Sequence, residues 1–315
     1  MVYLQRSLVI VVAWVSVFIF LATINSALAS FFTVGPKQCQ ECHVEVTKVW
    51  GGTAKFSGYK KIHKNKDAKK FLKAIGDKRM KKSPTCIMCH YTAVQKPFRK
   101  KPKIVHGASC EGCHGPASGW LDIHYDYGKG VKRSAESKEH KLTRLKMSDD
   151  AGMIRPSELY DVAANCMSCH GLATPNLPTE IAVKLFSSGH PLKTGFELVE
   201  YSQGRLRHRF YPPDQTVNKK MTSAELARLY AVGQAASLVY ASEAIKKAGD
   251  EAYIAEQKIR IATAIIALTA VQDKLVEAKA LLAKPSEENG RKFANALVGL
   301  DLTEVFAGML PKTYR

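Results

Sequence analysis

All eight cysteines of this 315-residue chain fall into four copies of one five-residue pattern, Cys-x-x-Cys-His. Each copy sets two thiols three residues apart, which is about one helical turn, and places an imidazole directly after the second thiol. Any fold for this chain must therefore hold two thiols and an imidazole close together at four separate places. The copies are Cys39–His43, Cys86–His90, Cys110–His114 and Cys166–His170.

Three kinds of chemistry use paired cysteines. An even number of cysteines in an exported chain first suggests disulfides, but disulfides do not require a histidine after the second cysteine. Zinc sites use the same ligands and tolerate varied spacing. In c-type haem attachment each residue has a task, because the two thiols form thioethers to the porphyrin and the histidine ligates the iron.

The pattern therefore predicts four covalently bound haem c groups. The predicted attachment residues are Cys39, Cys42, Cys86, Cys89, Cys110, Cys113, Cys166 and Cys169, and the predicted proximal iron ligands are His43, His90, His114 and His170.

The opposite face of each iron needs a second ligand if the iron is to be six-coordinate and suited to electron transfer. Of the ten histidines, four belong to the motifs and six do not. His124 is the best-placed candidate, because a turn and a short predicted helix carry it away from its own motif toward a neighbouring iron. His190 lies between turn-forming residues in an apolar stretch. The distal candidates are His124, His190, His63 and His106, and surface positions are expected for His140 and His208.

The order of the motifs resembles the cytochrome c554 family of tetrahaem cytochromes. The matching residues are Trp50–Ala54, the block Cys110-Glu-x-Cys113-His114-Gly115-Pro116, and His124 ten residues after His114. The resemblance covers the chain from Gly35 to His190 and implies a mostly helical periplasmic fold with haems packed in close pairs. It also implies that His124 ligates the first haem opposite His43 and that His190 ligates the third.

The chain departs from the family pattern at Lys55, where the family has a histidine shortly after the tryptophan and threonine. The fourth haem then has three alternatives: His63 as the distal ligand, Lys55 as the ligand, or an open iron. The family also tolerates a second haem without a distal protein ligand, and His106 is the alternative ligand there.

The N-terminus is typical of a secretory signal, with Arg6, an apolar run from Leu8 to Ile24, and Ala27-Leu28-Ala29. Residues 1–29 are expected to be a signal peptide. The alternative is a retained anchor in the inner membrane, since the run approaches the ~20 residues that span a bilayer. Either way the chain is predicted to be periplasmic.

The formal net charge of +19 is concentrated in a lysine-dense stretch between Lys60 and Lys103. Four haems would bring about eight propionate carboxylates, which offset part of this charge. The remainder predicts docking of redox proteins with an acidic face. No nucleic-acid partner is expected, because the stretch lacks the interleaved aromatic residues that stack bases.

The composition changes after Pro212-Pro213. Residues 30–212 are predicted to be a tetrahaem cytochrome c domain whose core is made by the haems, so the apo-protein should be unfolded. A capping box at Thr222–Glu225 and apolar residues at every seventh position predict three helices in residues 213–315. One of these helices is predicted to run without a break to Pro285. This mostly α-helical antiparallel bundle packs on the haem domain or provides a dimerisation or docking face. The repeat is Ile254, Ile261, Leu268, Leu275 and Leu282.

The predicted function is relay of electrons between redox partners through closely packed haems, and the chain is not expected to be an enzyme. The alternative is a multihaem enzyme with an open iron that acts on nitric oxide, nitrite or hydroxylamine. A third interpretation is a subunit recruited through the bundle into a larger respiratory complex.

Overall fold

Short helices carry the four motifs in the computed structural model, which describes residues 31–96, 101–246 and 248–315. The predicted signal peptide at residues 1–29 lies outside the described residues. Helix α2 (Pro36–Gln40) contains the first cysteine, and the histidine of that motif precedes α3 (Val44–Gly51). Helices α6 (Pro84–His90), α7 (Glu111–His114) and α9 (Leu159–His170) each end at their motif histidine.

The described chain is mostly helical, which confirms the predicted fold class, and residues 32–315 form one unit by their internal contacts. No helix among the described residues is long and apolar enough to cross a membrane. The further helices before residue 213 are α4 (Ala54–Lys61), α5 (Ala68–Ala74), α8 (Lys138–Asp150), α10 (Thr179–Ser187) and α11 (Leu198–Ser202), with 3-10 turns at Ile62–Lys64, Met80–Lys82, Ile123–Tyr125 and Arg133–Ala135.

A hairpin separates the second motif from the third. Strands β1 (Tyr91–Val94) and β2 (Lys103–Gly107) pair antiparallel, with Tyr91 opposite Gly107. Gly107 permits a close approach of α4, because a Cβ at this position would lie 2.0 Å from the carbonyl oxygen of Lys55. The hairpin therefore fixes the helix that carries Lys55 next to the haem motifs.

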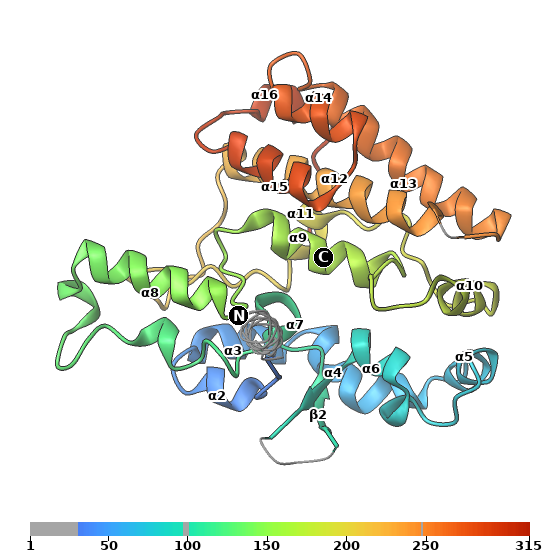
Figure 1. The fold of residues 1–315 in the computed structure, drawn as a ribbon, viewed down its shortest axis with the longest axis horizontal. Helices are drawn as coiled ribbons and strands as arrows, with labels where there is room; N and C mark the ends of the chain where they lie inside the picture. Colours follow the sequence, from blue (N-terminus) through green and yellow to red (C-terminus); the bar gives the residue numbers. More distant parts are fainter. Residues whose placement is uncertain (1–30, 97–100, 247) are drawn as a thin grey trace, which may run out of the picture. The chain divides into compact units, whose positions relative to one another are not determined.

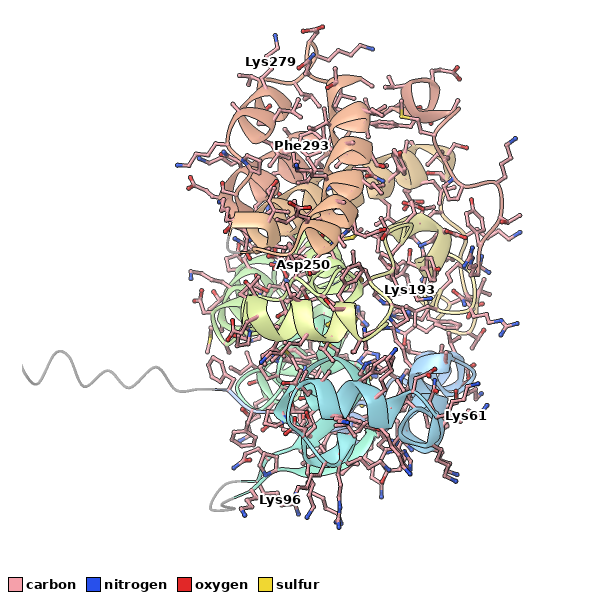
Figure 2. All side chains as sticks on the ribbon, turned by 90° about the vertical axis from the view of Figure 1, so that its right-hand side faces the viewer. Lys61, Lys96, Lys193, Asp250, Lys279 and Phe293 are labelled. Carbon is pink, nitrogen blue, oxygen red and sulfur yellow. The ribbon has the colours of Figure 1, made fainter. Side chains whose placement is uncertain are left out.

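Helix α12 (Ser223–Lys246) is the centre of the C-terminal bundle (Figure 1). Its N-terminus is the predicted capping box: Glu225 donates its backbone N–H to the Thr222 hydroxyl, and Thr222 donates its backbone N–H to the Glu225 carboxylate. Around α12 lie α13 (Glu251–Thr269), α15 (Glu287–Ala296) and α16 (Thr303–Phe306). Phe293 of α15 is fully buried (Figure 2).

The prediction of one continuous helix up to Pro285 is wrong. Helix α13 ends at Thr269, and a separate helix α14 covers Val276–Ala283. Val271 and Leu275, which lie in the break, are both buried. Two successive helices that face the same core keep one apolar repeat, so periodicity alone does not reveal the break. Among the described residues the bundle has five helices, α12 to α16, where the sequence predicted three.

The largest apolar core joins the bundle to the helix that carries the fourth motif. Tyr160, Ala163 and Met167 of α9 are buried in the same cluster as Leu281 and Phe293. Smaller clusters of five and three buried residues lie near the second and third motifs. The main core thus crosses the predicted boundary between residues 212 and 213.

Candidate haem-binding sites

The histidine of the first motif lies opposite His124. The ring centroids of His43 and His124 are 6.4 Å apart, and the ring planes differ by 19°. Metal–imidazole bonds are about 2 Å long and a ring centroid lies about 1 Å behind its nitrogen, so an iron held by two imidazoles places their centroids about 6 Å apart. The separation therefore fits one iron between these two rings.

Two further motif histidines face a histidine at a similar separation. The rings of His90 and His190 are 5.9 Å apart, and those of His114 and His208 are 6.3 Å apart. The structure thus places His190 beside the second motif, where the family resemblance implied the third. The third motif is instead faced by His208.

The second ring nitrogen of each facing histidine points at a backbone carbonyl. Since a carbonyl oxygen only accepts, Nδ1 carries the hydrogen in these contacts and Nε2 is left free for a metal. Metal-bound histidines are held in this way. The contacts are His124 Nδ1 to Leu121 O at 2.5 Å, His190 Nδ1 to Pro191 O at 3.1 Å, His208 Nδ1 to Leu206 O at 2.6 Å, and, for a motif histidine, His114 Nδ1 to Ile154 O at 2.8 Å.

Burial lowers the pKa of three motif imidazoles, those of His43, His90 and His170. It lowers the pKa of His90 to about 4, with smaller contributions from His190 and Lys55, and that of His170 to about 3. Burial also lowers the pKa of the facing histidines His124, His190 and His208. Neutral imidazole is the form that binds a metal, so the environment suits the predicted role.

The cysteines bring different motifs together. None of the eight forms a disulfide. The thiols of three pairs from different motifs are close enough to shift each other's pKa, which is raised in one thiol of each pair and lowered in the other. The pairs are Cys39 with Cys110, Cys113 with Cys166, and Cys89 with Cys169. The attachment sites therefore follow one another in the spatial order first, third, fourth, second.

The fourth motif has a different surrounding. The His170 ring stacks on Phe196 at a centroid distance of 4.1 Å, and no histidine ring among the described residues contacts it. Lys55 is the strongest charge acting on His170, and it also acts on Cys89, Cys113, Cys166 and Cys169. Of the three alternatives for this iron, Lys55 is the side chain that the structure brings near.

The two remaining distal candidates lie elsewhere. His63 is exposed, and the charges that act on it are Lys81 and Lys64. His106 of β2 lies in an aromatic group, with ring centroids 5.4 Å from Trp50 and 6.0 Å from Phe56. The structure brings neither histidine into ring contact with a described motif histidine.

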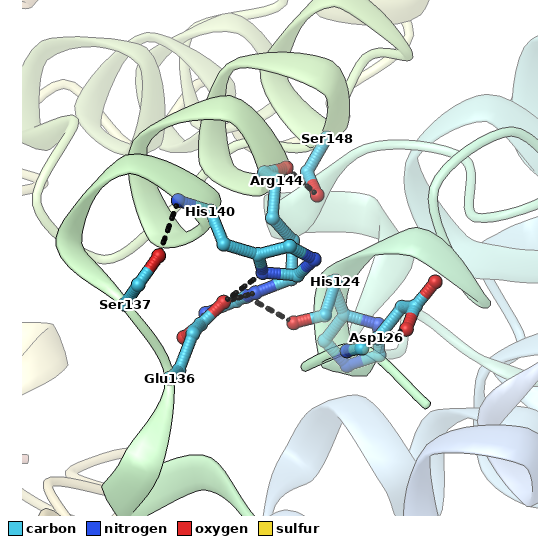
Figure 3. A network of polar contacts seen from close by, with 8 residues as sticks. His124, Asp126, Glu136, Ser137, His140, Arg144 and Ser148 are labelled. Carbon is cyan, nitrogen blue, oxygen red and sulfur yellow. Dashed lines mark hydrogen bonds and ion pairs between the residues drawn. The ribbon is translucent and has the colours of Figure 1, made fainter. Parts of the chain in front are cut away.

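A buried ion pair holds the backbone at His124 (Figure 3). The Arg144 guanidinium donates to both carboxylate oxygens of Glu136, at 2.6 and 2.7 Å, and to the carbonyl oxygen of His124 at 2.5 Å. These hydrogen bonds lower the pKa of Glu136 to about 2. His140, expected at the surface, lies 2.9 Å from the same carboxylate through Nδ1.

Sequence reasoning missed His208. Its neighbours Arg205, Arg207 and Arg209 gave it the pattern of a solvated segment. In the structure Arg209 pairs with Glu225 at 2.6 Å, and Asn218 donates to the carbonyl oxygen of Arg207. These contacts hold the segment around His208 against the start of α12. The His208 imidazole then lies beside the third motif.

Comparison with known proteins gives one family match and one curated relative, each covering part of the chain. Residues 38–115, which contain the first three motifs, match the family described as cytochrome c554 and c-prime. Cytochrome c-554 of Nitrosomonas europaea is 26% identical over 147 residues, which cover 43% of this chain and 56% of that protein. The chain thus spans about half the length of this relative, and no solved structure matches it. For this part of the chain, the matches confirm the resemblance to the cytochrome c554 family, a family of c-type cytochromes with covalently bound haem.

Proposed function

We propose that this protein is a periplasmic tetrahaem c-type cytochrome that relays electrons between redox partners. The observation that carries the proposal is the placement of three motif histidines about one iron's span from a second histidine, at 6.4, 5.9 and 6.3 Å between ring centroids. Two strong ligands on an iron favour electron transfer over binding of small molecules.

The chain's own residues would bind four haems in one way. Each cysteine pair would form two thioethers, and the following histidine would bind the iron. The histidine pairs that would hold one iron each are His43 with His124, His90 with His190, and His114 with His208. Bound haem c supplies one-electron chemistry between ferric and ferrous iron. The Nδ1 contacts described above hold four of these six imidazoles in the required tautomer, those of His114, His124, His190 and His208.

The thiol contacts support an order for the relay. The first motif adjoins the third, the third adjoins the fourth, and the fourth adjoins the second. In this order the first and second sites are the ends of the chain of haems. Partners would therefore exchange electrons near α2 and near α6.

Export and partner choice are also part of the proposal. The signal-like residues 1–29 would direct the chain to the periplasm, with or without a retained anchor. The charge of +19 would steer the protein to acidic redox partners. The bundle would serve as a face for a second copy or for another subunit.

A second candidate function rests on the fourth motif. Because no described histidine ring contacts His170, its iron is the one that could stay open. An open iron would allow an enzyme that acts on nitric oxide, nitrite or hydroxylamine.

The test is the EPR spectrum of the purified, oxidised protein with haem quantified by its pyridine haemochrome. We expect four haems per chain and low-spin signals from all of them. A count below four would overturn the assignment of the cysteines. Four haems with a high-spin ferric signal would replace the relay by the second candidate.

We further propose that the Lys55 amine is the distal ligand of the iron at His170. Lys55→Ala is then expected to turn one low-spin signal into a high-spin signal, because alanine offers no ligand. Lys55→His should restore a low-spin signal of the bis-histidine type. Lys60→Ala, on the exposed part of the same helix, is the control and should leave the spectrum unchanged. A low-spin spectrum in Lys55→Ala would contradict the assignment.

A further inference from the structure

Helix α13 directs a buried arginine at the end of the helix that carries the fourth motif. Arg260 is only 3% exposed. Its Nη1 donates to Gln257 Oε1 at 2.9 Å, and its Nη2 lies 3.5 Å from the carbonyl oxygen of Met167. Gln257, also fully buried, donates to the carbonyl oxygen of Gly171 at 2.8 Å. Arg260 and Gln257 together bind the C-terminal end of α9.

The charge of Arg260 has no partner of opposite sign. No aspartate or glutamate in the described part of the chain forms an ion pair with it, and its hydrogen-bond partners are neutral. Burial lowers the pKa of Arg260 to about 10, so the guanidinium is still positively charged at neutral pH. Leaving a charge buried and unpaired costs stability, which sets this residue apart from an ordinary packing contact.

Gly171 brings this charge next to the iron ligand. A Cβ on Gly171 would lie 1.8 Å from Arg260 Nη1, so only glycine lets the guanidinium lie against the residue that follows His170. Arg260 is among the charges that act on His170. Lys193, another cation that acts on His170, adds to the positive charge around it. The fourth motif thus lies in a positive field.

The first site offers a contrast. The arginine beside His124 is Arg144, whose charge is paired with Glu136, and Asp122 acts on the same imidazole, while Arg133 is the charged side chain of fixed sign that acts on His43. A fixed positive charge in a low-dielectric interior stabilises the state with one more electron, so it raises the reduction potential of a nearby haem.

We propose that Arg260 raises the reduction potential of the haem bound at His170, which makes the fourth site the favoured electron acceptor inside the relay. This inference rests on the proposed function. One electron moves from a neighbouring haem, which is oxidised, to the haem at His170, which is reduced from ferric to ferrous, and no bond forms or breaks. Arg260 does not contact the reacting atoms; its charge acts on the haem through the electric field at His170.

The experiment is a spectroelectrochemical titration of the purified holoprotein, resolved into four one-electron components. In Arg260→Gln we expect one component to shift to lower potential and the other three to stay. Gln257→Glu, which keeps the side-chain size and places a carboxylate against the guanidinium, should shift the same component in the same direction. Arg260→Lys retains the charge and should retain the potential. Arg228→Gln is the matched control, because this half-buried arginine of α12 bonds to Ala294 and does not act on His170.

Haem content separates the possible failures. Fewer than four haems in the unaltered protein would overturn the proposed function itself. Four haems together with unchanged components in Gln257→Glu would overturn the role of Arg260, and so would an equal shift in Arg228→Gln. Where Arg260→Gln loses haem, an unchanged component in Gln257→Glu would still overturn the proposal, because it would show that charge at this end of α9 does not act on the haem.

Discussion

Replacing His208 with alanine is expected to convert about a quarter of the total haem from low spin to high spin, which is one site in four. His208 faces His114 at 6.3 Å between ring centroids, with Nδ1 held by the carbonyl oxygen of Leu206. Alanine leaves the iron of the third site with one protein ligand. EPR and visible absorption of the oxidised protein measure the change, and the haem count should stay at four because the cysteines are untouched.

The matched control is His63→Ala. His63 is an exposed histidine that the sequence made a distal candidate and the structure places away from the motif histidines. We expect its spectrum to equal that of the unaltered protein. A low-spin spectrum in His208→Ala, or a high-spin signal in His63→Ala, would contradict the ligand assignment made from the ring geometry.

Gly290→Ala is expected to destabilise the protein by about 1–3 kcal/mol, the usual cost of overpacking a core. A Cβ at Gly290 would lie 2.1 Å from Cε2 of Tyr160, whose ring is 2% exposed. Helix α15 and helix α9 would have to separate, and α9 carries the fourth motif. Denaturant unfolding followed by circular dichroism measures the loss, and the haem yield should fall with it.

Gly58→Ala is the control for this prediction. Gly58 also lies inside a helix, α4, and a Cβ there meets no atom within 4 Å. Alanine is a better helix former than glycine by up to about 1 kcal/mol, so Gly58→Ala should be neutral or stabilising. The two substitutions are chemically identical, and opposite signs would isolate the contact with Tyr160. Equal effects would mean that α9 does not depend on α15.

The attachment residues could be proposed from the sequence alone, because haem attachment needs a fixed local spacing that can be read directly from the chain. The mostly helical fold and the family resemblance are confirmed. The position of His124 opposite His43 agrees with the resemblance. The contacts of His190 with His90 and of His208 with His114 could not be predicted in this way, since they depend on how distant loops return to the motifs.

The bundle shows a different limit. The apolar residues at every seventh position correctly mark a face toward a core, yet this spacing continues across the break between Thr269 and Val276. Nor does it reveal that Tyr160 and Met167, which precede the predicted boundary, belong to the same core as Phe293. The periodicity of apolar residues predicts which face of a helix is buried, but not which other helix packs against that face.

The ion pair of Arg144 with Glu136 has a consequence for how the first site can vary. Arg144 donates a hydrogen bond to the main-chain carbonyl oxygen of His124 and makes no hydrogen bond to the imidazole. This hydrogen bond therefore does not depend on which side chain is present at position 124. A methionine at this position, another ligand used by c-type cytochromes, would have the same hydrogen bond to its backbone, so the proposed iron would exchange one ligand for another while the ion pair stays in place.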